Sequence, residues 1–159
     1  QSHASIMFNV VESCSNLNQL VQVGIRDLSS DEHQLSLTHP KITTFFDWNL
    51  KGESFMGKTW NSQCEEIIAS LSNDVYISFD IDGLIPNLCP NTGTPVAGGF
   101  TLEQLSFLIF KVVESGRRII GFDLNEVSPG SSGDWDANVG ARALWQLVCA
   151  TELSRRISC

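Results

Sequence analysis

The sequence contains no Cys-x-x-Cys pair, no long apolar run and no excess of basic residues, and each of these absences excludes a class of protein. The cysteines are odd in number and widely spaced, which argues against a disulfide framework and against a zinc site. They are Cys14, Cys64, Cys89, Cys149 and Cys159. We therefore expect reduced, mostly buried thiols in a cytoplasmic protein.

Membrane and nucleic-acid proteins are also excluded by what the chain lacks. No apolar run approaches the length of a membrane span, and no signal peptide opens the chain. The net charge of −8 argues against nucleic acid and anionic membrane surfaces as partners, and it is compatible with a small cationic substrate. The 159 residues contain no internal repeat and no low-complexity linker, so we expect one globular domain.

Strand and helix patterns alternate along the chain, which predicts an α/β fold of βαβ units with a parallel sheet. The predicted strands cover residues 20–25, 42–46, 75–81 and 118–123. The predicted helices cover residues 6–17, 60–71, 101–116 and 139–157, with a loop or short helix over 28–40 and a long loop over 83–99. In the last helix, the side chains predicted to face the core are Leu144, Leu147, Val148 and Leu153.

Residues 75–83, VYISFDIDG, form the most informative segment, because they predict a buried strand that ends in two carboxylates. An almost continuous apolar strand suits a parallel sheet that is covered on both faces. Asp80 and Asp82 are two residues apart, so they would leave the same face of the strand, about 6.7 Å apart along it. Carboxylate ligands favour Mg²⁺, Ca²⁺ or Mn²⁺. The alternative is a strand that stops at Ser78, with both aspartates in a solvated loop.

Four acidic residues fall at or just after predicted strand ends: Asp27, Asp80, Asp82 and Glu126. In open parallel sheets, ligands bind outside the carboxyl ends of the strands. This shared placement predicts a single site.

Residues 78–101, SFDIDGLIPNLCPNTGTPVAGGFT, closely resemble the second metal-binding motif of the ureohydrolases, the family of arginases, agmatinases and formimidoylglutamases. Residues 121–129, GFDLNEVSP, resemble that family's late strand with its substrate-binding Glu. Residues 24–27 and Ser2-His3 are similar to two further family segments. The resemblance implies a three-layer αβα fold with a mainly parallel sheet. Residues 1–159 would be the C-terminal portion of that single domain, without its N-terminal metal-binding half.

The resemblance also implies a role for individual residues around two Mn²⁺ ions, which activate water for attack on a guanidino or formimino carbon. Asp80 matches the ligand that bridges both metals, and Asp82 matches a ligand of one of them. Glu126 matches the residue that pairs with the substrate guanidinium, and Thr94 matches a residue that lines the reaction centre. His3 resembles a proton shuttle. The alternatives are a solvated Glu126, an ordinary turn at Thr94 and a structural His3.

The chain also departs from the family pattern. Ile85 stands where most members have Asp, and Ser29 replaces the acidic residue that holds the α-amino group in arginases, although the substrate-binding Glu32 is retained nearby. The chain contains neither Gly-Gly-Asp-His nor Asp-x-His-x-Asp, so only two of the expected metal ligands are present. Together with Gln1 in place of an initiator Met, this predicts a truncated chain that is inactive alone.

The leading functional prediction is manganese-dependent hydrolysis of a non-peptide C–N bond in a linear amidine, of the agmatinase or formimidoylglutamase type. Arginase is the first alternative, and a non-catalytic fragment or structural relic of the family is the second. The resemblance further implies a small cationic or formimino substrate and a homo-oligomer when the protein is complete.

Overall fold

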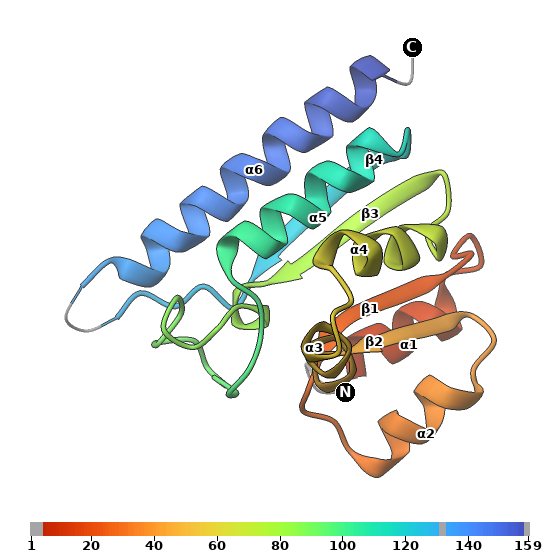
Figure 1. Cartoon of the computed structure of the whole chain (residues 1–159), viewed down its shortest axis with the longest axis horizontal. Helices are drawn as coiled ribbons and strands as arrows, with labels where there is room; N and C mark the ends of the chain where they lie inside the picture. Colours follow the sequence, from red (N-terminus) through yellow and green to blue (C-terminus); the bar gives the residue numbers. More distant parts are fainter. Residues whose placement is uncertain (1–4, 131–132, 158–159) are drawn as a thin grey trace.

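The structure is a computed structural model that describes residues 5–130 and 133–157 (Figure 1). Ser2, His3 and Cys159, which carry expectations above, lie outside the described residues. The elements are α1 (Ile6–Ser13), β1 (Leu20–Ile25), α2 (Ser30–Thr38), β2 (Ile42–Phe46), α3 (Asp47–Phe55), α4 (Trp60–Ala69), β3 (Asp74–Asp80), the 3-10 turn η2 (Ile81–Gly83), α5 (Leu102–Glu114), β4 (Arg118–Asn125) and α6 (Trp135–Ile157).

The strands form two separate parallel pairs, β1 with β2 and β3 with β4. This arrangement confirms the predicted α/β class and the parallel pairing. The ladder between β3 and β4 is interrupted once, because Val75 pairs with Ile119 whereas Tyr76 pairs with Gly121. Ile120 is therefore an extra residue on β4, as in a β-bulge. Beyond the bulge the ladder is regular and ends with Asp80 opposite Asn125.

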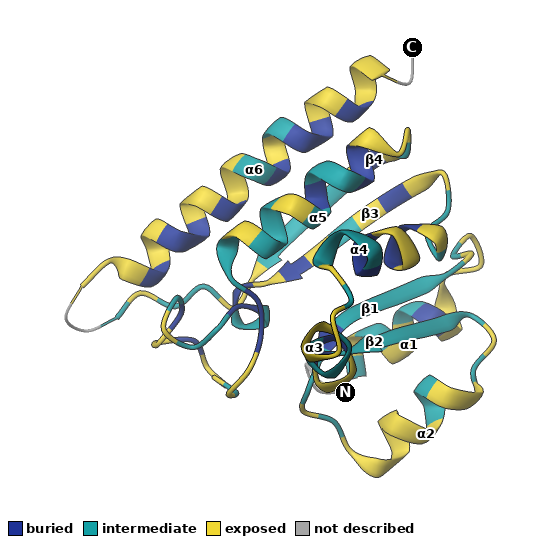
Figure 2. Cartoon of the chain, viewed as in Figure 1, coloured by how far each residue is buried: buried dark blue, intermediate teal, exposed yellow. Residues whose placement is uncertain are grey.

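The hydrophobic core lies between the β3–β4 pair and the helices α4, α5 and α6. Figure 2 shows the buried residues of α6 as a stripe along the helix face that is turned toward the rest of the molecule. Ile81, Ile119 and Leu147 are completely buried in this core. Burying each such side chain stabilises the fold by about 1.5–3 kcal/mol.

The opposite face of the β3–β4 pair is exposed, which corrects the prediction of a strand covered on both faces. Tyr76, Ser78 and Asp80 alternate with the core-facing residues of β3, and Tyr76 is 57% exposed. The strand also ends at Asp80, and the next residues turn into a 3-10 helix. The prediction that Asp82 shares the strand face of Asp80 is therefore wrong, and so is the alternative in which the strand stops at Ser78.

The buried face of α6 is not the predicted one. Of the four large residues expected to face the core, Leu147 is buried, but Leu144, Val148 and Leu153 are each more than 40% exposed. Small residues such as Gly140 and Ala143 occupy the inner face instead. A Cβ at Gly140 would lie 3.1 Å from Val127, so small residues let α6 approach the chain that follows β4 closely. Predicting the face from large aliphatic residues alone missed this.

Most element boundaries lie within two residues of the predicted ones, with three larger differences. The first helix ends at Ser13 rather than at residue 17, and α6 begins at Trp135 rather than at residue 139. Helix α3 was not predicted, because its Trp48 and Phe55 are more than 80% exposed and its sequence has little amphipathic pattern. In the described part of the chain, no helix combines the length and the apolar character that a membrane span requires.

Helix α5 has the predicted ends. Thr101 Oγ1 accepts from the Gln104 N–H and the Gln104 side chain accepts from the Thr101 N–H, which together form a capping box. Gly116 follows the helix with a φ of +82°, the left-handed conformation that ends many helices.

The long loop after β3 is closed at its base by backbone hydrogen bonds between its two ends. Ile85 N–H donates to the Phe100 carbonyl at 2.9 Å, and Phe100 N–H donates to the Gly83 carbonyl at 3.1 Å. Gly99 fits this closure because it has a φ of +92° and because a Cβ there would lie 2.7 Å from the Leu84 carbonyl oxygen. The loop base therefore requires glycine at position 99.

We predict that Gly99→Ala lowers the free energy of unfolding by about 3 kcal/mol, because it adds a backbone clash to left-handed strain. Gly116→Ala is the matched control, since Gly116 also has positive φ but a Cβ added there would meet no atom within 4 Å. The control should lose about 1 kcal/mol. Urea unfolding of the variants measures both values, and equal losses would contradict a steric requirement at position 99.

Candidate metal and substrate site

The carboxylate of Asp80 lies at the carboxyl end of β3, opposite Asn125 on β4. Partial desolvation at this sheet edge raises the pKa of Asp80, and the neighbouring charge of Asp82 raises it further. A hydrogen bond from Asn125 lowers the pKa of Asp80 and offsets these effects only in part. A carboxylate whose ionisation is disfavoured in this way marks a place where a bound cation would be stabilising.

Two sets of contacts fix Asp82 in the turn that follows β3. Thr94 Oγ1 donates to Asp82 Oδ2 at 3.4 Å. The guanidinium of Arg26 donates to the backbone carbonyl of Asp82, and its Nη2 lies 3.4 Å from the Leu84 carbonyl. The same guanidinium donates to the Val96 carbonyl through Nε at 3.2 Å and Nη2 at 3.1 Å. Arg26 therefore joins the end of β1 to the turn and to the far side of the loop.

Glu126 follows β4 in an unusual backbone conformation. Its φ of +62° makes it the one residue other than glycine with a positive φ in residues 5–130 and 133–157. Thr92 Oγ1 donates to the Glu126 carbonyl at 3.0 Å. The carboxylate lies beside Gly93, with Oε2 3.6 Å from the position that a Cβ would take there. Glu126 follows Asn125, the ladder partner of Asp80, and its charge also raises the pKa of Asp80.

The loop is anchored to α6 by a buried carboxylate. Asp136, in the first turn of α6, is completely buried. Its Oδ2 accepts from the Asn91 backbone N–H at 2.9 Å, and its Oδ1 accepts from Asn91 Nδ2 at 2.8 Å. Trp135 Nε1 donates to the Asn87 carbonyl at 3.0 Å. Sequence analysis missed this anchor, although an acidic residue at a helix N-terminus was a signal for a stabilising role there.

Polar side chains on the exposed face of β3 and β4 lead up to Asp80. Asp123 accepts hydrogen bonds from Ser78 Oγ, at 2.9 Å, and from Asn125 Nδ2. A hydrogen bond with Asp123 also raises the pKa of Tyr76. Because Asn125 contacts both Asp123 and Asp80, this row of side chains orients the amide that faces the candidate ligand.

The structure brings together four of the predicted site residues, namely Asp80, Asp82, Thr94 and Glu126, at one edge of the β3–β4 pair. Glu32 lies elsewhere, on α2, which packs against β2. Its Oε2 accepts from the Ser29 N–H at 2.7 Å, and this hydrogen bond lowers the pKa of Glu32. The predicted shuttle His3 lies outside the described residues. The roles of all these residues in binding and catalysis stay predictions.

Among the described residues, no thiol joins a group of side chains arranged to hold a metal ion. Cys14, Cys64, Cys89 and Cys149 are free, and burial raises the pKa of Cys64 to about 11. Cys64 and Cys89 are buried whereas Cys14 is exposed, so the expectation of mostly buried thiols is met only in part.

A metal ion would find only part of its coordination shell in the described residues. Within them, no group of three or more His, Cys, Asp or Glu side chains is arranged to hold a metal ion. Asp80 and Asp82 offer hard carboxylate oxygens, which suit Mn²⁺ or Mg²⁺. These two residues fit such an ion as a partial ligand set that further residues must complete.

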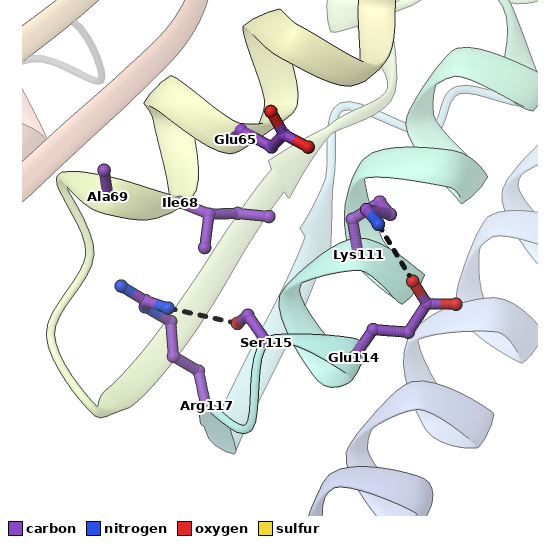
Figure 3. Close-up of a pocket in the computed structure, with 7 residues that line it drawn as sticks. All are labelled: Glu65, Ile68, Ala69, Lys111, Glu114, Ser115 and Arg117. Atoms are coloured by element: carbon purple, nitrogen blue, oxygen red, sulfur yellow. Dashed lines mark hydrogen bonds and ion pairs between the residues drawn. The ribbon is translucent and has the colours of Figure 1, made fainter.

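A shallow pocket of about 380 Å³ lies between α4 and α5, away from these carboxylates (Figure 3). Arg117, which lines it, immediately precedes β4, so the pocket lies at the amino ends of the strands. Its charged groups already have partners, because Arg117 donates to Ser115 Oγ at 3.1 Å, Lys111 pairs with Glu114 at 3.1 Å, and Glu65 accepts from Asn61 Nδ2 at 2.7 Å. The pocket therefore offers no free group for the chemistry expected at the other edge.

Comparisons with known proteins identify relatives of this chain. A sequence model of the Arginase family matches residues 1–150. The arginase of Emericella nidulans is 38% identical over 117 residues, which cover 72% of this chain and 34% of the relative. Human Arginase-1 is 29% identical over 122 residues, which cover 77% of this chain and 37% of the relative. The chain thus spans about a third of the length of these relatives.

The fold is similar to that of solved agmatinases and arginases. A hypothetical agmatinase from Burkholderia thailandensis superimposes with a TM-score of 0.72 at 26% identity, over 94% of this chain and 44% of the neighbour. The chain therefore contains part of the arginase-like α/β fold, as the sequence predicted.

We predict that Glu126→Gly raises the free energy of unfolding by about 1 kcal/mol, because glycine adopts a φ of +62° without steric cost. Glu126→Ala is the matched control: it also removes the carboxylate but keeps a Cβ in the left-handed conformation. Urea unfolding compares the two variants. A glycine variant no more stable than the alanine variant would show that the backbone at position 126 is unstrained.

Proposed function

This chain belongs to the arginase family, and from that membership we propose that the complete protein hydrolyses a non-peptide C–N bond in a linear amidine with Mn²⁺ as cofactor. The observation that carries the proposal is the placement of Asp80, Asp82 and Glu126 at one strand edge, where burial and the charges of Asp82 and Glu126 raise the pKa of Asp80. Such a gathering of carboxylates suits both a divalent cation and a cationic substrate.

In this proposal, some of the side chains bind the metal and others bind the substrate. Asp80 and Asp82 would hold Mn²⁺, which supplies a Lewis acid that lowers the pKa of water. The carboxylate of Glu126 would accept paired hydrogen bonds from the planar amidinium and orient its carbon. Thr94, through its hydrogen bond to Asp82, would border the reacting carbon. Water adds its oxygen to that carbon, the C–N bond breaks, and the departing nitrogen takes a proton, which His3 would deliver.

The neighbourhood of Ser29 favours agmatine or formimidoylglutamate over arginine as substrate. An α-ammonium group would require a free carboxylate near this position. Serine at position 29 has no carboxylate, and its hydroxyl is engaged as the N-cap of α2, where it accepts from the Glu32 N–H at 3.2 Å. The Glu32 carboxylate is engaged by the Ser29 N–H in return. Arginase activity is the second candidate, and the arginase names of the two curated relatives favour it.

We predict that Asp80→Ala and Asp82→Ala in the complete protein each reduce turnover at least ~100-fold and lower the bound Mn²⁺, because each removes a hard ligand. Asp74→Ala is the control, since Asp74 lies at the opposite end of the same strand and pairs with Arg118 at 2.7 Å. Steady-state rates and metal analysis after dialysis give the readouts. Unchanged metal content in both ligand variants would refute the assignment, and an inactive wild-type protein would favour the non-catalytic alternative.

We predict that the complete protein has a higher kcat/KM for agmatine or formimidoylglutamate than for arginine. Ser29→Asp should shift this ratio toward arginine, because a carboxylate in place of the hydroxyl can both cap α2 and attract an α-ammonium group. Side-by-side release of urea, or of formamide, measures the three substrates. A wild-type preference for arginine would reverse the substrate order and leave the reaction class unaffected.

A further inference from the structure

We infer that Thr92 is a positioning residue, which holds Glu126 in its left-handed backbone conformation and thereby fixes where the carboxylate meets the substrate. The inference deepens the proposed function and depends on it only for the identity of the molecule that Glu126 binds.

The conformation of Glu126 needs an external support. The other described residues with positive φ are glycines, whereas Glu126 carries a long side chain at a φ of +62°. Side chains of L-residues crowd the backbone in this region, so an unsupported Glu would relax to negative φ. Strained conformations of this kind persist where the surrounding structure holds them, and they concentrate at functional sites.

The hydroxyl of Thr92 supplies that support. Thr92 is 5% exposed, and its Oγ1 donates to the Glu126 carbonyl oxygen at 3.0 Å. A β-branched side chain has few χ1 rotamers, so the hydroxyl is held in place by its own packing. A carbonyl fixed by this bond leaves the peptide after Glu126 little freedom to rotate.

The next residue makes room for the carboxylate itself. Gly93 has no side chain, and Glu126 Oε2 lies 3.6 Å from where its Cβ would be. Thr92 and Gly93 therefore act on different parts of Glu126: the first holds the backbone, and the second borders the carboxylate. Together they direct it to the edge where Asp80 lies.

Thr92 is itself fixed from the core. Asn91, the residue before it, donates from its backbone and its side chain to the two oxygens of the buried Asp136, at 2.9 and 2.8 Å. Hydrogen bonds to a charged acceptor are stronger than those between neutral groups. Glu126 is thus bonded to Thr92, and the neighbouring Asn91 is bonded to Asp136 in the first turn of α6. These bonds connect the position of Glu126 to that helix.

The test compares Thr92→Val, which keeps the shape and removes the donor, with Thr92→Ser, which keeps the donor. In the complete protein, we expect Thr92→Val to raise KM about 2- to 10-fold for the preferred amidine, with little change in kcat, as for loss of one hydrogen bond that orients a binding group. Thr92→Ser should restore KM to within about twofold of the wild-type value. Asn91→Ala, which leaves Thr92 intact, should raise KM in the same direction and serves if Thr92→Val does not fold.

Crystal structures of the same variants give a readout that needs no turnover. Glu126 should leave the left-handed region in Thr92→Val and stay there in Thr92→Ser. A Thr92→Val protein that keeps both the left-handed Glu126 and the wild-type KM would overturn the inference. So would a Thr92→Ser protein that behaves like Thr92→Val, since the methyl group would then matter rather than the hydroxyl. If no amidine is hydrolysed, the proposed function fails while the φ of Glu126 still decides the role of Thr92.

Discussion

The polar connection made by Arg26 joins the two halves of this structure. The strand pairs β1–β2 and β3–β4 share no ladder in the described residues, so their relative position depends on side chains. The Arg26 guanidinium, at the end of β1, bonds carbonyl oxygens on both sides of the loop that follows β3. Beside it, Gly24 leaves space for the ring of Phe100, which would lie 2.4 Å from a Cβ at that position. A guanidinium suits this task because it presents several donors in one rigid plane.

The candidate site combines like charges and a strained backbone, both of which destabilise the folded chain. Asp80, Asp82 and Glu126 repel one another, and Glu126 has a strained backbone. The loop beside them is held by paired polar groups, as in the bonds between Asn91 and the buried Asp136. Unfavourable charges and backbone strain at one edge, in a fold that is well packed elsewhere, are typical of a functional site.

Local sequence patterns predicted much of the fold. Strands β1 and β2 have the predicted bounds, and the capping box at Thr101 and the glycine at position 116 mark the ends of α5 as expected. Features that depend on distant contacts were missed. The inner face of α6 is set by how closely Gly140 approaches Val127, and the periodicity of large residues does not contain that information. The same holds for the site: the motif singled out Asp80, Asp82, Thr94 and Glu126, but the anchor at Asp136 and the left-handed Glu126 depend on contacts across more than 30 residues.

The extra residue Ile120 in β4 determines which face of the sheet each later residue of this strand occupies. Because Tyr76 pairs with Gly121 rather than with Ile120, Phe122 and Leu124 pack against the core while Asp123 and Asn125 share the open face with Asp80. A one-residue slip exchanges the two faces of a strand. If Ile120 paired with Tyr76 and the ladder continued without a bulge, Asp123 and Asn125 would turn to the core and Phe122 to the open face, with the sequence unchanged. The number of residues between the bulge and Glu126 therefore decides which side chains of β4 reach the edge where Asp80 lies.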